Sequence, residues 1–382
     1  MSEARGEERA AYGGMARSLR IESVQVRSFR NLDAVDVELG ARFNVIAGDN
    51  GQGKTNLLEA LYVLATSKSF RSAKMTDVVS FAGDLASVRG RVEEDGDRRV
   101  QSVGIRAGAR LVRIDDKRPP TLAAYAVKTP MVVFHPGEIA LSMGASAERR
   151  KLLDRTALYL SPASMGDHES YGKALRARQR TLEMRGVRAS ELVEWETLCV
   201  RHGLALMDAR AHAAELLCSS AAEAFRKIAA PDLVLDLAYA PGAPRTEDAY
   251  RAALEDRRPS DVRRGSAGVG PHRDDLALAI AGHPVRGVAS QGQHRAVTLA
   301  LKSAEIAVIG GARGVRPILL LDDVSSELDR DRTAALFAFL RDQDGQVLLT
   351  TTRPELIDTG RDAARADFTI RGGVLTRSSR VD

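Results

Sequence analysis

Apolar and polar residues alternate along two early segments of the chain, 24–27 and 35–39. A period of two is typical of antiparallel strands that have one face in solvent. The run Phe43–Ala47 that follows is almost wholly apolar and predicts a buried strand. The start of the chain therefore predicts a half-exposed strand pair followed by a strand inside a core.

Three later segments also have strand character, and they predict a meander. They are 88–93, 99–106 and 110–114. Asp95-Gly96 separates the first two and favours a tight hairpin turn, and Gly108 marks the second turn.

The strand pattern disappears between about 145 and 230, where Arg, Glu, Ala and Leu dominate and apolar positions recur at helical intervals. This pattern predicts an all-helical insertion. Pro231 and the Pro/Gly cluster 241–244 end it, and the segment 265–271 predicts a loop.

The last third of the chain alternates helices with strands. We predict a helix at 293–309, a strand at 318–321, a helix at 330–341, a strand at 346–350 and a terminal hairpin of 368–370 and 374–376. Together with a helix at 56–65, these elements predict an α/β domain interrupted by the helical insertion. The predicted division is a disordered tail at 1–17, the N-terminal part of the domain at 18–144, a helical arm at 145–232 and the C-terminal part at 233–382.

Composition narrows the class of protein. The 382 residues exceed one ordinary core, and 44% hydrophobic with 28% charged residues excludes a disordered or low-complexity chain. No apolar run reaches the roughly 20 residues of a membrane span. Cys199 and Cys218 are too few for a disulfide framework, and the first residues form no apolar leader, so we expect a cytoplasmic protein whose translation starts at Met1 or Met15. The net charge of +5 permits a polyanionic ligand without requiring one.

Residues 48–55 read Gly-Asp-Asn-Gly-Gln-Gly-Lys-Thr and match the phosphate-loop pattern at every specified position. The segment stands between a predicted buried strand and a predicted helix, as that motif requires. Glycines let backbone N–H groups approach phosphate oxygens, and the helix N-terminus favours anions. We therefore expect Lys54 to bind the β- and γ-phosphates of ATP and Thr55 to be a ligand of Mg²⁺.

The apolar strand at 318–321 ends in two carboxylates, Asp322 and Asp323. We expect Asp322 to be a second Mg²⁺ ligand and Asp323 to orient the attacking water, which makes Lys54, Asp322 and Asp323 the catalytic set. Ser326 and Asp329 follow in the next loop. Asp329 is either part of a D-loop or the N-cap of the helix after it.

Ser290-Gln291-Gly292-Gln293 opens another predicted helix. Taken locally, Ser290 is a good helix N-cap. Taken with the phosphate loop and the acidic strand end, this segment has the position of the signature loop in ABC-type ATPases. The three motifs in this order are similar to an ABC-type ATPase head.

Six blocks of sequence, in order, resemble the RecF family of bacterial recombination proteins. They are Phe-Arg-Asn-Leu at 29–32, the phosphate loop at 48–56, Thr-Ser-Lys-Ser-Phe-Arg at 66–71, Gly-Pro-His-Arg-Asp-Asp at 270–275, Ser-Gln-Gly-Gln-His-Arg at 290–295 and Asp-Asp-Val-Ser-Ser-Glu-Leu-Asp at 322–329. The resemblance implies an α/β fold: an ABC-type, SMC-like P-loop ATPase head with an antiparallel β-lobe and an inserted all-helical arm domain.

The resemblance also implies a set of site residues. Nucleotide contacts are expected from Arg30, Asn31, Gly48, Asp49, Asn50, Gly51, Gln52, Gly53, Lys54, Thr55 and Asn56. Ser290, Gln291, Gly292 and Gln293 are expected to act in trans, at the γ-phosphate held by a second subunit. Ser326 and Asp329 are the implied D-loop residues.

The sequence departs from the family pattern at two places, and a third place differs from transporter ATPases. His294 replaces a second glutamine, and Pro136-Gly137-Glu138 replaces Pro-Glu-Asp. Thr350-Thr351-Thr352 stands where transporter ATPases have a switch histidine. These departures leave the equivalent of the Q-loop and any switch residue unassigned.

DNA binding that is independent of sequence requires cations directed at phosphates. The predicted arm has a basic stretch, and two further cations follow the phosphate-loop helix. The candidate contacts are Lys68, Arg71, Arg149, Arg150, Lys151, Lys173 and Arg176. Aromatic residues are only 4% of the chain, which favours contacts with duplex backbone over base stacking. The alternative for such a basic run is a solvated helix face.

The resemblance implies a cytoplasmic, nucleoid-associated ATPase that dimerises on ATP, hydrolyses it slowly and binds double-stranded and gapped DNA. RecR and RecO are the implied protein partners, and RecA is affected indirectly through its loading at gaps. The alternative function is a DNA-structuring protein that binds ATP without hydrolysing it. The Asp322-Asp323 pair argues against that alternative, because it retains the carboxylates that hydrolysis requires.

Overall fold

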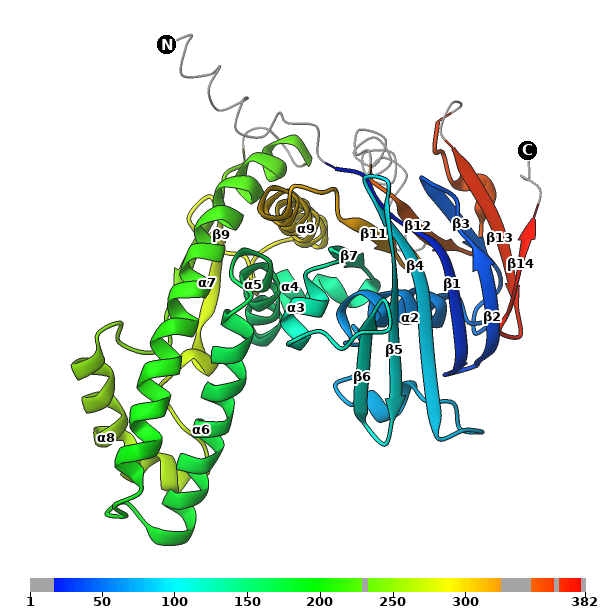
Figure 1. Ribbon diagram of the computed structural model, residues 1–382. Coiled ribbons are helices and arrows are strands. Elements are labelled where there is room, and N and C mark those ends of the chain that lie inside the picture. Colours follow the sequence, from blue (N-terminus) through cyan, green and yellow to red (C-terminus); the bar gives the residue numbers. More distant parts are fainter. Residues whose placement is uncertain (1–16, 229–232, 324–344, 361–363, 379–382) are drawn as a thin grey trace. The chain divides into compact units, whose positions relative to one another are not determined.

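The computed structural model describes residues 17–228, 233–323, 345–360 and 364–378. The described residues form two compact units (Figure 1). Unit 1 combines residues up to Glu138 with those from Ile309 onward, and unit 2 is Ile139–Val308. Unit 2 is therefore inserted in the sequence of unit 1, and it extends beyond the predicted arm at 145–232 in both directions.

Unit 1 contains a five-stranded antiparallel sheet with the order β2-β1-β4-β5-β6. Its strands are β1 (Leu19–Phe29), β2 (Leu32–Glu38), β4 (Leu85–Glu94), β5 (Asp97–Arg106) and β6 (Ala109–Ile114). The predicted alternation is confirmed in β1, where Val24 and Val26 are buried while Gln25 and Arg27 are exposed. The predicted turn between β4 and β5 is also confirmed, since Asp95 and Gly96 have φ angles of 52° and 92°.

The second sheet of unit 1 has six strands in the order β14-β13-β3-β12-β11-β7. Its strands are β3 (Phe43–Ala47), β7 (Met131–Phe134), β11 (Ile318–Leu321), β12 (Val347–Thr351), β13 (Arg365–Arg371) and β14 (Val374–Ser378). Neighbouring strands from β13 to β7 are parallel, and β14 is antiparallel to β13. Because parallel strands end at the same edge, the segments after β3, β11 and β12 meet there.

Helix α2 (Lys54–Thr66) belongs to the core of unit 1. Leu57, Leu58 and Leu61 are almost fully buried, in one cluster with residues of both sheets. This burial fixes α2 in the core, and Figure 1 shows the helix passing behind β4 and β5. The shorter helices of unit 1 are η1 (Met75–Val78), α3 (Leu122–Ala126) and η4 (Pro354–Leu356), and η2 (Pro136–Ile139) leads into unit 2.

Unit 2 is mainly helical, as predicted, but it also contains a small sheet. Its helices are α4 (Ala140–Met143), α5 (Ser146–Leu160), α6 (Ser164–Arg185), α7 (Leu192–Ile228), α8 (Glu247–Arg264) and η3 (Pro271–Arg273). Helix α9 (Gln291–Arg313) starts in this unit. The sheet has the order β10-β9-β8 and consists of β8 (Leu235–Ala240), β9 (Asp275–Ile280) and β10 (His283–Pro284).

Helix α8 was not predicted from the sequence. It contains Pro259, and Tyr250 and Leu254 are its only fully buried apolar side chains. A helix with so narrow an apolar face leaves almost no periodic signal. None of the described helices combines the length and the apolar character needed to cross a bilayer.

Candidate nucleotide site

The phosphate loop lies between β3 and α2, as the motif predicts. Gly51 and Gly53 have φ angles of +79° and +113°, which only glycine adopts without cost. A Cβ atom on Gly48 would lie 2.5 Å from the carbonyl oxygen of Ile370. Glycine is thus required at these three positions by backbone conformation or by close packing.

The hairpin of β13 and β14 braces the phosphate loop from the C-terminal end of the chain. The amide of Gly372 donates to Oε1 of Gln52 at 2.7 Å, and the amide of Gly373 donates to the backbone oxygen of Gln52 at 3.0 Å. The sequence predicted the hairpin but not this contact, which joins residues about 320 positions apart. The Gln52 side chain therefore positions the loop.

Lys54 is buried within the loop that it follows, with 7% of its surface exposed. Its Nζ donates to the carbonyl oxygens of Gly48 and Asp49 at 2.6 and 2.9 Å. Burial lowers the pKa of Lys54 from its ordinary value, while Asp323, Asp322 and Asp49 oppose that shift. The loop thus holds a cation where phosphate oxygens are expected to bind.

Asp322 lies next to Thr55, as the motifs predict. Oγ1 of Thr55 donates to Oδ1 of Asp322 at 2.9 Å, and Oγ1 of Thr350 donates to the same oxygen at 2.8 Å. A carboxylate and a hydroxyl at this distance are the oxygen donors that Mg²⁺ prefers. Thr55 and Asp322 therefore fit a Mg²⁺ site.

Thr350 is a site residue whose role the sequence did not reveal. It is almost fully buried, and its hydroxyl bonds the Asp322 carboxylate and accepts from the amide of Asp323 at 2.9 Å. The available signal was its position at the end of a strand next to β11. From the sequence, this place was noted only because threonines stand where transporter ATPases have a switch histidine.

Asp323 has a φ angle of +49°, which is uncommon for a residue with a side chain. Aspartate tolerates this conformation better than most residues, and such strain often marks functional sites. The chain turns at Asp323, so this residue does not continue the direction of β11. Ser326 and Asp329, the predicted D-loop residues, lie outside the described residues.

The segment after β7 lies beside the acidic strand end. The amide of Asp322 donates to the carbonyl oxygen of Phe134 at 2.8 Å. His135 stacks on Phe70, with ring centroids 5.3 Å apart, and its Nε2 is 3.5 Å from Oε1 of Glu138. The segment that departs from the Pro-Glu-Asp pattern is therefore at the site, although no phosphate or metal contact is assigned to it.

Arg30 was expected to contact the nucleotide, but its guanidinium has other partners. It forms two hydrogen bonds with the fully buried carboxylate of Glu59, at 2.6 and 2.8 Å. Further bonds reach the hydroxyl of Ser72 and the carbonyl oxygen of Asp77. Because Glu59 is on α2, Arg30 fixes this helix to the end of β1, and its expected contact with the nucleotide stays a prediction.

Asn31 links the phosphate loop to a neighbouring polar chain. Its Nδ2 donates to the carbonyl oxygen of Gly51 at 3.4 Å, and its Oδ1 accepts from Asn56 at 2.7 Å. Arg71 donates to Oδ1 of Asn56 at 2.7 Å and has 41% of its side chain exposed. Asn31 and Asn56 therefore support the loop from outside, and Arg71 forms the exposed end of this chain of contacts.

The predicted signature segment forms the first turn of α9. Ser290 Oγ accepts from the amide of Gln293 at 3.2 Å, and Gln293 Oε1 accepts from the amide of Ser290 at 2.8 Å. This reciprocal pair is a capping box. The N-cap reading is thus confirmed, yet Ser290 and Gln291 remain exposed at a helix N-terminus, where anions bind favourably.

His294 is buried beneath this first turn, with 4% of its surface exposed. Its Nδ1 is 3.2 Å from Oγ of Ser142 on α4, and the same hydroxyl is 3.1 Å from the carbonyl oxygen of His294. Burial lowers the pKa of His294, so the ring is neutral at pH 7. The residue that replaces a second glutamine therefore anchors the signature helix within unit 2.

The segment 270–275 has a structural role in unit 2. Asp274 is fully buried and accepts hydrogen bonds from Arg210 at 2.8 Å, from Tyr239 at 2.7 Å and from the amide of Gly242 at 2.7 Å. Asp275 forms a bidentate pair with Arg149. The motif therefore connects helices, the small sheet and the loop before α8.

Three candidate DNA contacts on α5 differ in the exposure and the partners of their side chains. Arg149 is 6% exposed, and its remaining donors reach the carbonyl oxygens of Leu141 and Gly144, which removes it from the candidates. Arg150 bonds Ser146 and the carbonyl oxygen of Asp274. Lys151 is exposed and paired with Glu148. The sequence could not distinguish these neighbours, because only the fold shows which side of α5 is covered.

Comparisons with known proteins give a family match over most of the chain. Residues 20–372 match the family model described as the RecF/RecN/SMC N terminal domain. The chain is 37% identical over 367 residues to a protein named DNA replication and repair protein RecF from Anaeromyxobacter sp. (strain Fw109-5), and the match covers 94% of this chain and 99% of that one. A protein of the same name from Geobacter sulfurreducens is 36% identical, with coverage of 94% and 100%.

Solved structures are similar in the same way. A structure described as the recombination mediator protein RecF-ATPrS in the RecFOR pathway has a TM-score of 0.84 at 27% identity and covers 96% of this chain and 100% of its own. The Smc head domain of Pyrococcus furiosus, with a TM-score of 0.54 at 16% identity, covers 94% and 96% of the two chains and shares the fold. The predicted SMC-like ABC ATPase head is therefore confirmed.

Proposed function

Because the chain belongs to the RecF family of DNA replication and repair proteins, we propose that it is an ATPase that binds ATP between two of its copies and thereby holds DNA. The observation that carries this proposal is the contact of 2.9 Å between Thr55 of the phosphate loop and Asp322 at the end of β11. Two motifs 267 positions apart form one polar site, as ATP with Mg²⁺ requires.

The catalytic residues have distinct tasks in this proposal. Lys54 neutralises charge on the β- and γ-phosphates, and Thr55 and Asp322 hold Mg²⁺, which supplies further positive charge at the phosphate oxygens when bound. Asp323 orients the attacking water and accepts its proton. Its side chain is one methylene shorter than the glutamate usual in ABC-type ATPases, which favours slow hydrolysis.

A complete site requires a second copy. Ser290, Gln291, Gly292 and Gln293 begin a helix whose first amide groups are suited to an anion. In the proposed dimer they contact the γ-phosphate held by the other copy, together with the D-loop residues Ser326 and Asp329. ATP then stabilises the closed pair, because it binds that state preferentially.

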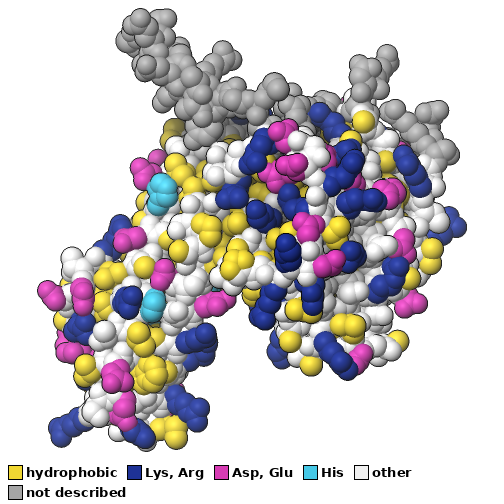
Figure 2. All heavy atoms as spheres, in the orientation of Figure 1, with side chains coloured by type: hydrophobic (Ala, Val, Ile, Leu, Met, Phe, Trp, Pro, Cys, Tyr) yellow, Lys and Arg dark blue, Asp and Glu magenta, His cyan; other side chains and the backbone are white. Residues whose placement is uncertain are grey.

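For DNA, the exposed face of α6 offers the clearest contacts in unit 2. Lys173 and Arg176 are exposed, three positions apart, and form no ion pair with any described residue. Lys68, Arg71, Arg150 and Lys151 are weaker candidates. Cations and carboxylates are intermixed on the face drawn in Figure 2, so the contact is expected to be local and directed at backbone phosphates.

The RecFOR context of the related structure supports a role in recombination mediation. We propose that this chain acts with RecR and RecO at gapped or junction DNA and that RecA loading is its indirect outcome. The protein is then cytoplasmic and nucleoid-associated.

The test is fluorescence anisotropy of a labelled gapped duplex, with and without ATP and Mg²⁺. The wild type should bind more tightly with ATP, and Lys54→Met should lose that gain. Lys74→Met is the matched control, because Lys74 is an exposed lysine of unit 1 outside the phosphate loop. Binding that is absent or indifferent to ATP in the wild type contradicts the proposal.

The second candidate, ATP binding without hydrolysis, is separated by phosphate release. Asp323→Asn keeps a residue that tolerates a positive φ angle, so the turn should remain folded. We expect hydrolysis to fall at least about tenfold while ATP binding persists. Equal release from the variant and the wild type would remove Asp323 from the mechanism, and no release from the wild type would favour the alternative.

A further inference from the structure

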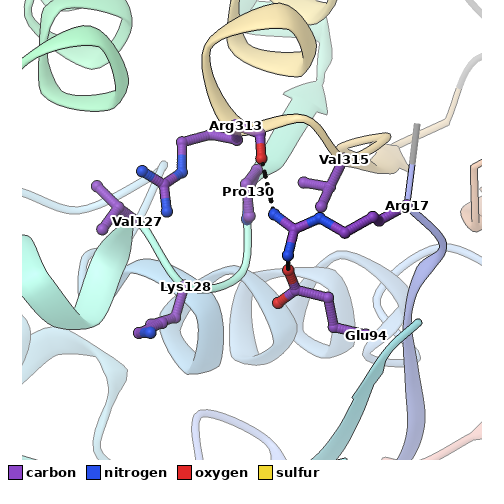
Figure 3. A pocket seen from close by; sticks show the side chains of 7 residues that line it. All are labelled: Arg17, Glu94, Val127, Lys128, Pro130, Arg313 and Val315. Carbon is purple, nitrogen blue, oxygen red and sulfur yellow. Dashed lines mark hydrogen bonds and ion pairs between the residues drawn. The ribbon is translucent and has the colours of Figure 1, made fainter. Parts of the chain in front are cut away.

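A second cationic site lies in unit 1 (Figure 3). It is a cavity of about 120 Å³ lined by four charged side chains, those of Arg17, Glu94, Lys128 and Arg313, with Pro130 among the apolar residues between them. Neither the motifs nor the proposed ATPase mechanism uses any of these residues.

The cavity is at the opposite edge of the six-stranded sheet from the phosphate loop. Pro130 immediately precedes β7, and the segment after Arg313 leads into β11. These two strands are parallel, so their starts share one edge, whereas Asp322 follows the end of β11. A ligand in this cavity is therefore separate from the phosphates of ATP.

Positive charge in the cavity exceeds negative charge. Glu94 pairs with Arg17 at 2.9 Å and also with Arg99 at 2.9 Å, so two guanidinium groups share one carboxylate. The side chains of Lys128 and Arg313 form no ion pair with any residue that the structure describes. The lining of the cavity therefore carries two cations, Lys128 and Arg313, that pair with no described carboxylate.

Arg313 provides a second observation. Its Nε is buried and has no hydrogen-bond partner. Leaving a buried charged donor unpaired is costly, so this atom requires a partner from outside the protein, such as water or an anion. Capping of α9 does not account for it, because Arg17 already bonds the carbonyl oxygen of Arg313 at 3.1 Å.

We propose that this cavity binds a single phosphate group through Arg313 and Lys128, with Arg17 at its edge. The guanidinium fork matches phosphate oxygens, and the lysine adds a point charge. The volume corresponds to about four waters, which suits one phosphate group. The phosphate is either free inorganic phosphate or the 5′-phosphate of a DNA end.

The first experiment measures the apparent affinity for inorganic phosphate from its effect on thermal unfolding of the full chain. The chain carries Lys54→Met, so that phosphate binding at the phosphate loop is weakened. Sodium phosphate is compared with sodium chloride at equal ionic strength. Lys128→Gln with Arg313→Gln should weaken phosphate binding more than about 100-fold, because two charge-assisted contacts are lost. Arg118→Gln with Arg377→Gln, which changes two exposed arginines of unit 1, should have no effect.

Equal phosphate binding by the two double variants overturns the proposal. Misfolding of the cavity variant is detected by its unfolding midpoint in chloride, and the single change Lys128→Gln, at an exposed side chain, then provides the test.

The second experiment identifies the source and rests on the proposed DNA-binding function. Gapped duplexes with a 5′-phosphate or a 5′-hydroxyl at the gap are compared with ATP present. A preference for the phosphorylated end that the cavity variant loses assigns the site to DNA. Absence of a preference, with phosphate binding intact, assigns it to the free ion. Failure of ATP-dependent DNA binding refutes the proposed function and leaves the first experiment unchanged.

Discussion

Two of the three Asp-Asp pairs in this chain have the same sequence but different surroundings in the fold. Asp274-Asp275 is in unit 2, and Asp322-Asp323 follows β11 in unit 1. The first carboxylate of each pair is buried, at 0% and 7% exposure. What differs is the set of partners that the fold supplies.

Both oxygens of the Asp274 carboxylate accept hydrogen bonds. A buried arginine, a tyrosine hydroxyl and a backbone amide donate to it, and Arg210 is itself held by Asp154 at 2.7 Å. Among the described residues, Asp322 accepts side-chain hydrogen bonds from the hydroxyl groups of Thr55 and Thr350, and Lys54 acts on it through its charge. A carboxylate bonded by hydroxyl groups can still accept Mg²⁺, whereas one saturated by an arginine stabilises the fold. The partners that the fold supplies therefore distinguish the two carboxylates.

The largest expected effect comes from removing the charge of Asp274. Asp274→Asn removes one of the two carboxylates that pair with the buried Arg210. We therefore expect unit 2 to lose about 3 kcal/mol of stability. Trp195 is the only tryptophan and lies on α7, so its fluorescence during denaturant unfolding reports on this unit. Asp248→Asn, on the exposed surface of α8, is the matched control. A loss below 1 kcal/mol would show that the network is not what holds unit 2 together.

The second prediction separates an effect on ATP hydrolysis from an effect on the free energy of unfolding. Asp322→Asn should reduce Mg²⁺-dependent phosphate release more than about 100-fold, because a charged oxygen at the metal site is lost. Its partners are neutral hydroxyls, so unfolding should change by no more than about 1 kcal/mol. If the variant unfolds as readily as Asp274→Asn, the two pairs do not differ in kind.

The smallest effect concerns the hydroxyl that holds Asp322. Thr350→Val removes bonds to the Asp322 carboxylate and the Asp323 amide at nearly constant volume, and should cost about 1–2 kcal/mol. We also expect a several-fold higher Mg²⁺ concentration for half-maximal phosphate release. Thr369→Val, on β13, changes a threonine away from the acidic strand end and should leave both quantities unchanged. An unchanged Mg²⁺ requirement in Thr350→Val would leave Thr350 with a packing role alone.

The residues that the sequence predicted well are those whose chemistry is local. Gly51, Gly53 and Lys54 follow from backbone conformation and charge at fixed spacing, and Asp322 follows from a strand that ends at the same edge. Arg30 was expected at the nucleotide because of the family resemblance, and Arg149 was expected at DNA because it belongs to a basic stretch of the predicted arm. Their carboxylate partners, Glu59 and Asp275, lie 29 and 126 positions away, and only the folded chain brings them close.

The small sheet and α8 of unit 2 were missed for a related reason. Their burial is supplied by other helices, since Leu235 and Leu276 belong to a cluster that includes residues of α7 and α9. A six-residue strand or a helix with two buried apolar residues has too little pattern of its own.

The bracing of the phosphate loop also sets the order in which the molecule can be made. β3 pairs with β12 and β13, and Gln52 is held by Gly372 and Gly373. All of these partners are synthesised in the last tenth of the chain. Unit 2, whose residues end at Val308, has its whole sequence available earlier. During translation the ATP site is therefore the last part to be completed, and a chain truncated before the terminal hairpin should not bind nucleotide.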